Sequence, residues 1–373
     1  MKKESSHISG KIADFHTHSN HSIDGTKSIK HILKSAHKNN VTMLGVTDHN
    51  TVSGVNKFMD KERFPRESVM ELASTKTILV PGVEITARIN EIKNIKGNSV
   101  KLHLLAYGID RNDDSPISKL LKLKSINDHH VDLGFVYQLQ KHFNLALSKQ
   151  DVLDFFIHCK MNNHDVKAFG KEEAFNFVKF LGLELTENDE QLSEIISNFD
   201  VTDRFNLDVD DVINLVHASG GIVLLAHPQV SLRRTKYDKN VISYLIEHEI
   251  DGFELYYPQH TKTCDMYLRK VSKENNIHLH SAGSDYHDDN HNYEHDGFSI
   301  PYEPVTLDKV KALIDYLNEM KVARDEGTLI LKNYKNLKDF NVEETLEKYR
   351  RRFCALEGIK RTTPIEEIEE IEL

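Results

Sequence analysis

Short apolar runs of strand length recur along this chain, and several are followed at once by histidine and carboxylate side chains. A single HxH pair would be weak evidence, because two histidines at that spacing share a face in many exposed strands. Neutral imidazole nitrogen and carboxylate oxygen are ligands that suit divalent Zn, Mn or Fe, and a carboxylate can bridge two ions. Six clusters in register with six strand ends therefore predict a hydrolytic centre with several metals, and the alternative is histidines scattered over a His-rich surface. The clusters are Asp14-Phe15-His16-Thr17-His18, Thr47-Asp48-His49, Pro81-Gly82-Val83-Glu84, His103, Ala226-His227-Pro228 and Gly283-Ser284-Asp285-Tyr286-His287.

Strand and helix patterns alternate in the first hundred residues and again after residue 207. Repeated strand–helix units predict a parallel sheet or a barrel. Ligand-type residues at the C-terminal ends of several strands favour a barrel, because only closure brings the first and last strand ends together. We therefore expect an α/β fold with seven strands, at residues 11–15, 43–46, 77–83, 101–107, 222–226, 252–255 and 277–282.

Helical periodicity accompanies these strands and dominates the middle of the chain. Residues 90–98 are polar and include Gly97, which predicts a hairpin or a mobile loop. Between residues 115 and 207 helical patterns follow one another at 117–143, 148–156, 171–180 and 188–199, without a convincing strand. This stretch is expected to be an α-helical insertion. Barrel helices are expected at 29–38, from about 51, and at 208–219, 241–247, 262–275 and 307–324, the last packing outside.

These patterns divide the chain into four parts. The expected parts are a first barrel segment at 1–114, the helical insertion at 115–207, a second barrel segment at 208–325 and a C-terminal extension at 326–373. The extension ends in an acidic Ile/Glu repeat, which is expected to be a frayed, solvated tail or, alternatively, a contact for a partner.

Composition narrows the class of protein. Apolar residues make up 39% of the chain and charged residues 28%, as in soluble globular proteins, and no apolar run is long enough to span a membrane. The polar N-terminus is no secretory signal, and three widely spaced cysteines imply no disulfide framework, so a cytoplasmic setting is expected. A net charge of −10 argues against an extended nucleic-acid groove, but bound cations would still attract a small phosphorylated substrate. No protein partner is evident.

The sequence motifs, taken in order, resemble those of the polymerase-and-histidinol-phosphatase (PHP) family. The resemblance spans residues 12–109 and 212–288 and implies a distorted seven-stranded (β/α) TIM-like barrel with a trinuclear metal site that hydrolyses phosphate esters. It is greatest to the branch of bacterial 3′,5′-nucleotide bisphosphatases and 5′→3′ exoribonucleases, where an inserted helical domain covers the barrel mouth. The matching motifs are DFHTHS, SIDG, GVTDHN, VPGVEIT, HLLAYGI, GGIVLLAHP, DGFELYYPQHT and SAGSDYH.

The resemblance also implies a ligand set for two to three Mn, Fe or Zn ions. Glu84 would bridge two metals, and Glu84, His227 and His287 are the predicted catalytic residues. His21 is an alternative to Asp24 at the third ion, but Asp followed by Gly is the motif form. The implied sets are His16, His18, Glu84 and Asp285 for the first metal, Glu84, His103 and His227 for the second, and Asp24, His49 and His287 for the third.

Several neighbouring residues have a possible supporting role. Asp14 and Asp48 precede ligand histidines and are expected to orient them. Arg88, Arg233 and Arg234 follow ligand motifs and are predicted to clamp a phosphate, with ordinary surface charge as the alternative. His129 and His130 are either solvated surface or substrate contacts, and Tyr256-Tyr257 is either barrel packing or a platform for a base. The branch usually carries paired arginines at the start of the insertion, whereas residues 126–132 contain none.

The expected chemistry is hydrolysis by a hydroxide that bridges two metals and attacks phosphorus in line, with a histidine or a metal-bound water protonating the leaving group. The expected substrate is a small phosphorylated metabolite or nucleotide. The alternatives are a phosphodiesterase on a cyclic phosphate or a 5′→3′ exoribonuclease, and, less favoured, a non-catalytic binding module. The insertion is expected to form a lid, because it follows the fourth strand beside His103 and would start at the barrel mouth.

Overall fold

The computed structural model describes residues 11–22, 25, 27–61, 70–71, 77–94, 97–146, 155, 158, 171–183, 205–233, 239–287, 299–301, 304–325 and 333–357. Its strands form one nine-stranded sheet in the order β8-β7-β6-β5-β4-β2-β1-β9, with β3 paired to β4. Seven of the strands are those predicted: β1 (Ile12–Asp14), β2 (Val41–Val46), β4 (Ile78–Lys93), β5 (Ser99–Tyr107), β6 (Ile222–Leu225), β7 (Gly252–Tyr256) and β8 (Leu279–Ala282). The short β3 (Met70–Glu71) and β9 (Val305–Thr306) add edge pairings to β4 and β1.

The sheet closes on itself where its first and last barrel strands end. The backbone N–H of Phe15 donates to Ala282 O at 2.7 Å, and the N–H of Asp285 donates to His16 O at 2.9 Å. These bonds bring the ends of β1 and β8 together and confirm the predicted distorted seven-stranded barrel.

One barrel strand runs against the others. β5 pairs antiparallel with both β4 and β6, whereas β1–β2, β2–β4, β6–β7 and β7–β8 are parallel. The cause is a hairpin at residues 94–98, where Asn94 N–H donates to Asn98 O at 2.8 Å and Gly97 adopts a φ of +79°. The hairpin confirms one of the two structures predicted for residues 90–98, and it makes β5 the exception to the parallel pairing of the other barrel strands.

The insertion consequently leaves the barrel at the opposite end from the mouth. The chain continues from β5 to α3 (Pro116–Phe143), where the N–H of Ile117 donates to Ser219 Oγ at 3.1 Å, just before β6 begins. The expectation that the insertion starts at the mouth beside His103 was therefore wrong, because β5 carries the chain away from the mouth.

Helices cover the outside of the barrel. In α1 (Ile29–Lys38) the buried positions are Ile29, Ile32, Leu33 and Ala36, the spacing of one helix face, and the Ser28 side chain accepts the N–H of His31 as an N-cap. The other helices beside the strands are α2 (Ser53–Lys61), α7 (Val209–Ala218), α8 (Pro228–Arg233), α9 (Lys239–Glu247) and α10 (Lys262–Glu274). Among the described residues, no helix is long and apolar enough to cross a membrane.

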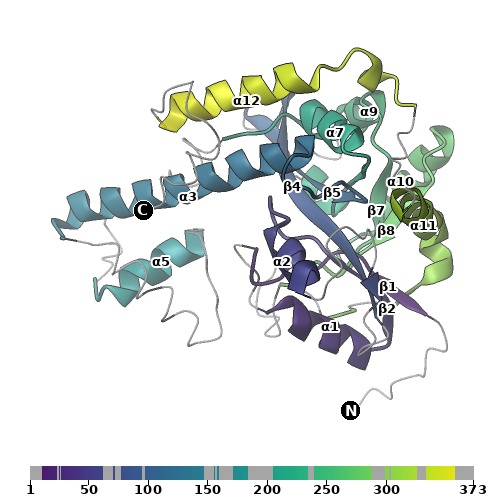
Figure 1. Ribbon diagram of the computed structural model, residues 1–373, viewed down its shortest axis with the longest axis horizontal. Helices are drawn as coiled ribbons and strands as arrows, with labels where there is room; N and C mark the ends of the chain where they lie inside the picture. Colours follow the sequence, from purple (N-terminus) through teal and green to yellow (C-terminus); the bar gives the residue numbers. More distant parts are fainter. Residues whose placement is uncertain are drawn as a thin grey trace.

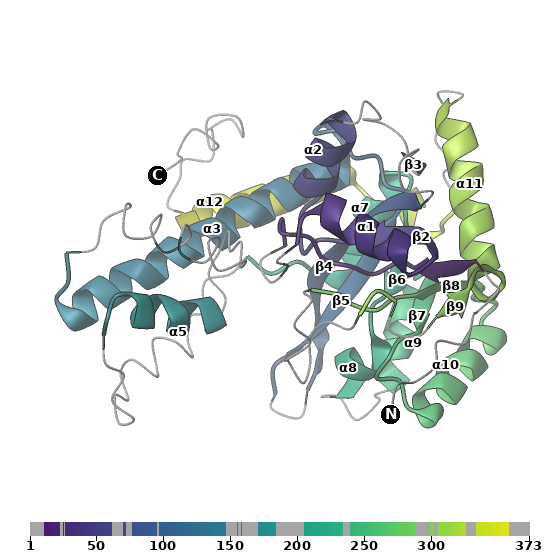
Figure 2. The ribbon, with the colours of Figure 1, turned by 90° about the horizontal axis from the view of Figure 1, so that it is seen from below.

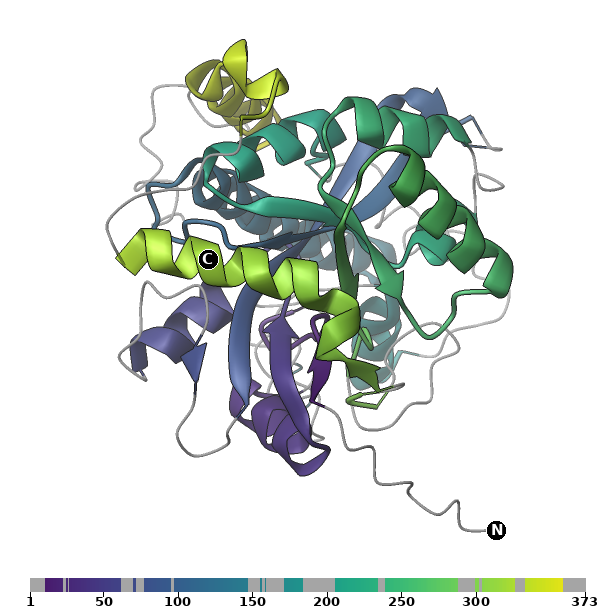
Figure 3. The ribbon, with the colours of Figure 1, turned by 90° about the vertical axis from the view of Figure 1, so that its right-hand side faces the viewer.

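The N-terminal end of the barrel is closed by α11 (Lys311–Asp325), which follows the 3₁₀ turn η1 (Leu307–Val310). Leu313, Leu317 and Met320 belong to the same buried cluster as Phe15 and Tyr107 inside the barrel. Figure 3 shows α11 lying across this end of the strands. The predicted helix is present, but it plugs the barrel end instead of packing outside, because its apolar side chains meet the inward-facing residues of the strands.

α3 has two differently placed halves. Its first half packs with α7 and α12 (Val342–Glu357), and the 3₁₀ turn η2 (Asn336–Lys338) precedes α12. Its second half projects from the barrel with α5 (Lys171–Phe180) beside it (Figures 1 and 2). The projecting part has its own buried side chains, Leu139, Phe155, Phe177 and Val178. The predicted helix at 171–180 is confirmed, whereas 188–199 and most of 148–156 lie outside the described residues.

Candidate metal centre

The structure brings together eight of the nine predicted metal ligands at the mouth of the barrel. The ninth, Asp24, lies outside the described residues. The barrel strands position the eight at their ends: His16 and His18 after β1, His49 after β2, Glu84 within β4, His103 on β5, His227 after β6, and Asp285 and His287 after β8.

Glu84 lies at the centre of this group. Its Oε1 is 2.9 Å from both His103 Nδ1 and His227 Nε2. Its Oε2 is 3.2 Å from the Nε2 atoms of His16 and His18 and 3.1 Å from His49 Nδ1. The two oxygens of one fully buried carboxylate thus face two separate sets of imidazoles, as a bridging carboxylate requires.

The first set has the spacing of ligands around one ion. His16 Nε2 and His18 Nε2 are 3.1 Å apart, and each is 3.2 Å from Asp285 Oδ1. Two donor atoms that bind one tetrahedral ion at about 2.0–2.1 Å are themselves about 3.3 Å apart. His16, His18, Glu84 and Asp285 could therefore hold a single cation.

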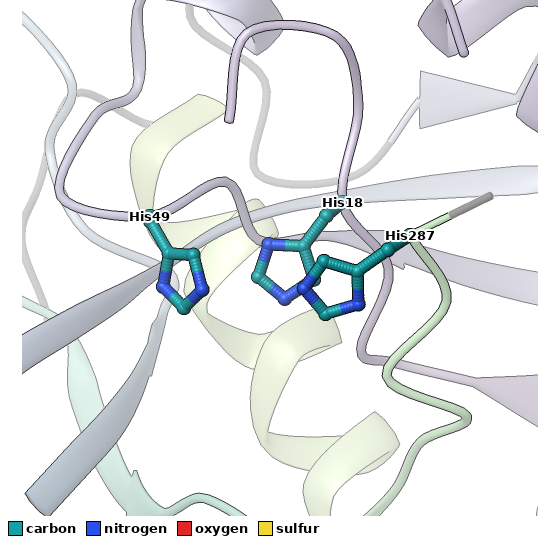
Figure 4. Close-up of side chains that lie close together, drawn as sticks. All are labelled: His18, His49 and His287. Carbon is teal, nitrogen blue, oxygen red and sulfur yellow. The ribbon is translucent and has the colours of Figure 1, made fainter. Parts of the chain in front are cut away.

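Three imidazoles form a neighbouring set, shown in Figure 4. The rings of His18 and His287 stack with centroids 4.2 Å apart, and His49 lies 4.5 Å from His18 and 6.1 Å from His287. One ligand atom from each of the three lies within 4.8 Å of the others, and His49 also groups in this way with Glu84 and His103. His49 is thus placed to serve either of two adjacent ions.

The charges and bonding of the cluster fit a divalent cation. Glu84 Oε2 is buried and accepts no hydrogen bond within the described part of the chain, although three imidazole nitrogens surround it. Burial alone would raise the pKa of Glu84, but His49, His16 and His103 hold it well below its usual value. Burial lowers the pKa of His103 to about 4 against the opposing effect of Glu84, so this imidazole is neutral, as a metal ligand must be.

His16 differs from His103 because carboxylates surround it. Burial alone would lower its pKa, but Glu254, Asp285 and Glu84 together raise it well above the usual value. In the absence of a cation a proton on His16 would balance these charges, and a metal ion would replace that proton.

Glu254, which sequence reasoning missed, contacts the predicted ligands. It is fully buried on β7; its Oε1 lies 3.0 Å from His16 Nδ1, and its Oε2 accepts the backbone N–H of His227 at 2.6 Å. A carboxylate on the second nitrogen of a metal-binding histidine fixes the tautomer and the direction of the ring. The available signal was a carboxylate inside the apolar strand pattern of DGFELYY, where an acid is buried only at a cost.

Replacing Glu254 with glutamine should weaken metal binding while preserving the fold. The amide has nearly the same size but turns a donor group or a weaker acceptor toward His16, so the ring loses its anionic partner. We expect metal affinity and esterase activity to fall by about 10- to 100-fold, the usual effect of losing such a partner. Metal titration and an unchanged circular dichroism spectrum would test this, and wild-type metal affinity in the variant would contradict it.

Asp14 and Asp48 support the ligands differently from expectation. Asp14 Oδ1 accepts the backbone N–H groups of His16 at 3.3 Å and Ser284 at 3.0 Å. Asp48 accepts the N–H and the hydroxyl of Ser19 at 2.6 and 2.8 Å. We expected these carboxylates to orient the imidazole rings. They instead accept bonds from the main chain and from the Ser19 side chain beside the predicted ligands.

Two of the predicted ligands have a strained backbone. His227 has a φ of +27° and Asp285 a φ of +55°, values that cost side-chain-bearing residues about 1–3 kcal/mol each. The bond from His227 N–H to Glu254 and the bond from Asp285 N–H to His16 O hold these conformations. Such strain is common where side chains must converge on a ligand.

The structure describes two more of the residues with a possible supporting role, Arg88 and Tyr257. Arg88 is half-buried, and its guanidinium donates to Asn206 Oδ1 at 2.8 Å and to Ser99 Oγ at 3.3 Å. Tyr257 donates its hydroxyl to Asp285 Oδ2 at 3.3 Å, so it adjoins the cluster. The side chains of Arg233, His129 and His130, and the whole of Arg234, lie outside the described residues.

The chain is similar in sequence to two known enzymes. The chain is 23% identical over 302 residues to a phosphoribosyl 1,2-cyclic phosphate 1,2-diphosphodiesterase of Eggerthella lenta, covering 78% of this chain and 99% of the relative. It is 25% identical over 284 residues to a 5′-3′ exoribonuclease of Haemophilus influenzae, covering 74% and 89%.

A solved structure supports the fold. A protein of Bifidobacterium adolescentis, provisionally described as a metal-dependent phosphoesterase, aligns with a TM-score of 0.57 at 20% identity, covering 82% of this chain and 96% of that one. The family model of the PHP domain matches residues 14–279, more than half of the chain. The chain therefore belongs to the PHP-domain family of metal-dependent phosphoesterases.

Proposed function

We propose that this protein hydrolyses phosphate esters of small phosphorylated metabolites or short nucleotides at the Glu84 cluster, with two to three divalent metal ions bound there. The observation that carries this proposal is the arrangement around Glu84, whose two oxygens face separate sets of imidazoles at 2.9–3.2 Å. Bound metal ions would neutralise the phosphoryl oxygens and make water a nucleophile at neutral pH.

The protein's own residues would hold and orient these components. Glu84 and Asp285 supply negative charge, since neighbouring imidazoles lower the pKa of both carboxyls despite their burial. His49 and His103 are the ring ligands with the most exposed side chains, at 15% and 22%, whereas those of His16 and His18 are fully buried. The substrate would therefore approach from the side of His49 and His103.

The β4–β5 hairpin supplies positive charge beyond the cluster. Arg88 and Lys101 are directly paired across the two strands, on the same face as Glu84 and His103. Four residues of strand separate Arg88 from Glu84, about 13 Å. That separation suits contact with a second anionic group of a substrate, so Arg88 remains a proposed substrate contact, held in position by Asn206 and Ser99.

Hydrolysis of a phosphodiester is the favoured form of this activity. Both relatives compared above are named for reactions of phosphodiesters, and the first aligns over 99% of its own length. A small cyclic phosphate is favoured over RNA as the substrate, because the chain carries a net charge of −10 and thus offers no general attraction to a polyanion.

A pair of chromogenic esters tests the reaction class. With Mn²⁺ present, bis(p-nitrophenyl) phosphate should be hydrolysed faster than p-nitrophenyl phosphate. A panel of a ribose 1,2-cyclic phosphate, a 3′,5′-nucleoside bisphosphate and a 5′-phosphorylated oligoribonucleotide would then identify the substrate type. Preference for the monoester would overturn the diesterase assignment, and metal binding without hydrolysis of any compound would indicate a binding module.

The proposed ligand set also predicts the metal content. Nine ligands can supply three sites with three or four donors each when one carboxylate is shared, so protein purified without chelator should contain about two to three Mn, Fe or Zn ions per chain. Elemental analysis would measure this content. A value below about one ion per chain would exclude a multi-metal centre.

A further inference from the structure

A cavity of about 270 Å³ lies beside the junction of β1 with β8, and none of the eight proposed metal ligands lines it. We call it the seam pocket. Asp14 and Ser284, which are 1% and 2% exposed, are among its most buried lining residues, and His260 lines it on the loop before α10. Lys262 and Lys309 are exposed lining residues and form its rim.

Three residues of the pocket carry buried polar atoms without hydrogen bonds. Asp14 Oδ2, Ser284 Oγ and His260 Nε2 form no hydrogen bond of good geometry within the described part of the chain, although burial raises the pKa of the Asp14 carboxyl and the Ser284 side chain is near enough to lower it in part. An unsatisfied buried polar group costs about 1–3 kcal/mol, so such groups commonly have a ligand or water as a partner. Three of them in one small cavity therefore mark a place where a polar ligand or water is held.

The chemistry of these atoms favours a ligand that carries hydroxyl groups. His260 Nδ1 lies 3.1 Å from the carbonyl oxygen of Leu255, to which it can only donate, so Nε2 of the neutral ring is an acceptor. Asp14 Oδ1 already accepts two backbone N–H groups, which leaves Oδ2 for another donor. The serine hydroxyl can donate or accept. Ligand hydroxyls match this set.

The rim, in contrast, favours an anion. Within the described residues neither Lys262 nor Lys309 has an ion-pair partner. The carboxylate of Asp265 also lines the pocket, but it is paired with Arg269 at 2.9 Å. Lys309 Nζ lies 5.6 Å from the centroid of the Tyr256 ring, which also lines the pocket. Lys262 is the first residue of α10, a 13-residue helix whose N-terminal dipole adds to the positive potential.

We propose that the seam pocket binds a small phosphorylated polyol, such as a sugar monophosphate, with its hydroxyl groups at Asp14, Ser284 and His260 and its phosphate at Lys262 and Lys309. The cavity is slightly below the roughly 300–1,000 Å³ of pockets for drug-sized ligands, so it suits a metabolite of this size. The pocket borders the Glu84 cluster, because Tyr257 lines it and donates to Asp285, but none of the eight proposed ligands lines it. The proposal does not depend on the proposed function of that cluster.

Calorimetric titration of the metal-loaded, full-length protein would test the proposal. The probe is the phosphonate analogue of ribose 5-phosphate, in which CH₂ replaces the ester oxygen and prevents hydrolysis. Substituting both Lys262→Ala and Lys309→Ala should weaken its binding at least about tenfold, since two charge-assisted contacts are lost. The matched double variant Lys270→Ala and Lys273→Ala, exposed on the same helix, should bind as the wild type does.

A second probe tests the proposed contacts of Asp14, Ser284 and His260 with ligand hydroxyl groups. Methylphosphonate has the anion but no hydroxyl groups, so the wild type should bind it at least about tenfold more weakly than the sugar phosphonate. His260→Phe should reduce that preference. Identical isotherms for the two lysine double variants would place the ligand at the metal centre and overturn the proposal. A lack of saturable binding of the sugar phosphonate would also overturn it. Hydrolysis of bis(p-nitrophenyl) phosphate should remain unchanged in the rim variant, so the outcome is distinguishable from failure of the proposed enzymatic function.

Discussion

Replacing Glu84 with glutamine should lower hydrolysis of an activated phosphodiester by at least about 100-fold, in line with the several kcal/mol that bound metals contribute to stabilising charge in the transition state. The physical reason is the position of the carboxylate. Its two oxygens contact five imidazoles in two sets, so the substitution removes a charge and a ligand shared by both sets.

A comparison of variants separates bridging from simple coordination. Of the two Glu84 oxygens, His103 contacts Oε1 alone, so His103→Gln should lose less metal and less activity than Glu84→Gln. Glu274→Gln makes the same chemical change on an exposed part of α10 and should leave both quantities unchanged. Metal content by elemental analysis and rate with bis(p-nitrophenyl) phosphate are the two measurements. Retained activity with unchanged metal content in Glu84→Gln would show that Glu84 is structural.

Removing the projecting part of the insertion should abolish most turnover of the natural substrate while leaving metal bound. We propose that residues 115–207 form a lid that selects substrate and supplies no metal ligands. Although the insertion leaves the barrel at the far end, α3 has 28 residues and is about 42 Å long, so it can carry the projecting part back past the mouth. The loss of remote binding energy should slow the natural substrate by on the order of 100-fold, whereas a small activated ester uses none of that energy. Hydrolysis of bis(p-nitrophenyl) phosphate should therefore remain near the wild-type rate.

The structure shows where to cut the chain. Ile117, Leu120 and Leu123 belong to the main core, so removing the whole of 115–207 would expose apolar surface. Asn127 Oδ1 accepts the backbone N–H of Phe205 at 2.6 Å, which brings the two ends of the projecting part together. Replacing residues 128–204 with a Gly/Ser linker of about four residues, a common length for such connections, should keep the barrel intact.

The comparison requires a folded, monodisperse variant with the wild-type circular dichroism of the barrel. Among such variants, loss of metal would show that the insertion contributes ligands. Undiminished turnover of the natural substrate would show that the insertion has no part in selection.

Local patterns in the sequence were sufficient for most elements and for selecting the residues that gather around Glu84. α1 begins and ends where predicted, because four apolar residues at helical spacing follow a serine that caps the helix. The eight described residues of this cluster could be chosen because imidazoles and carboxylates directly follow apolar strands in a pattern that resembles one family. Their roles at individual ions remain proposals.

Only the tertiary structure decided how these pieces face one another. The alternation of inward- and outward-facing side chains along β5 is the same for either strand direction. Only the tertiary structure showed that the hairpin forms and that β5 also pairs antiparallel with β6, so that the insertion leaves at the far end of the barrel. Glu254 acquires its role from contact with His16, 238 positions away in the sequence. Side-chain periodicity is a local property that the sequence by itself determined, whereas strand direction and contacts between distant residues follow from closure of the barrel.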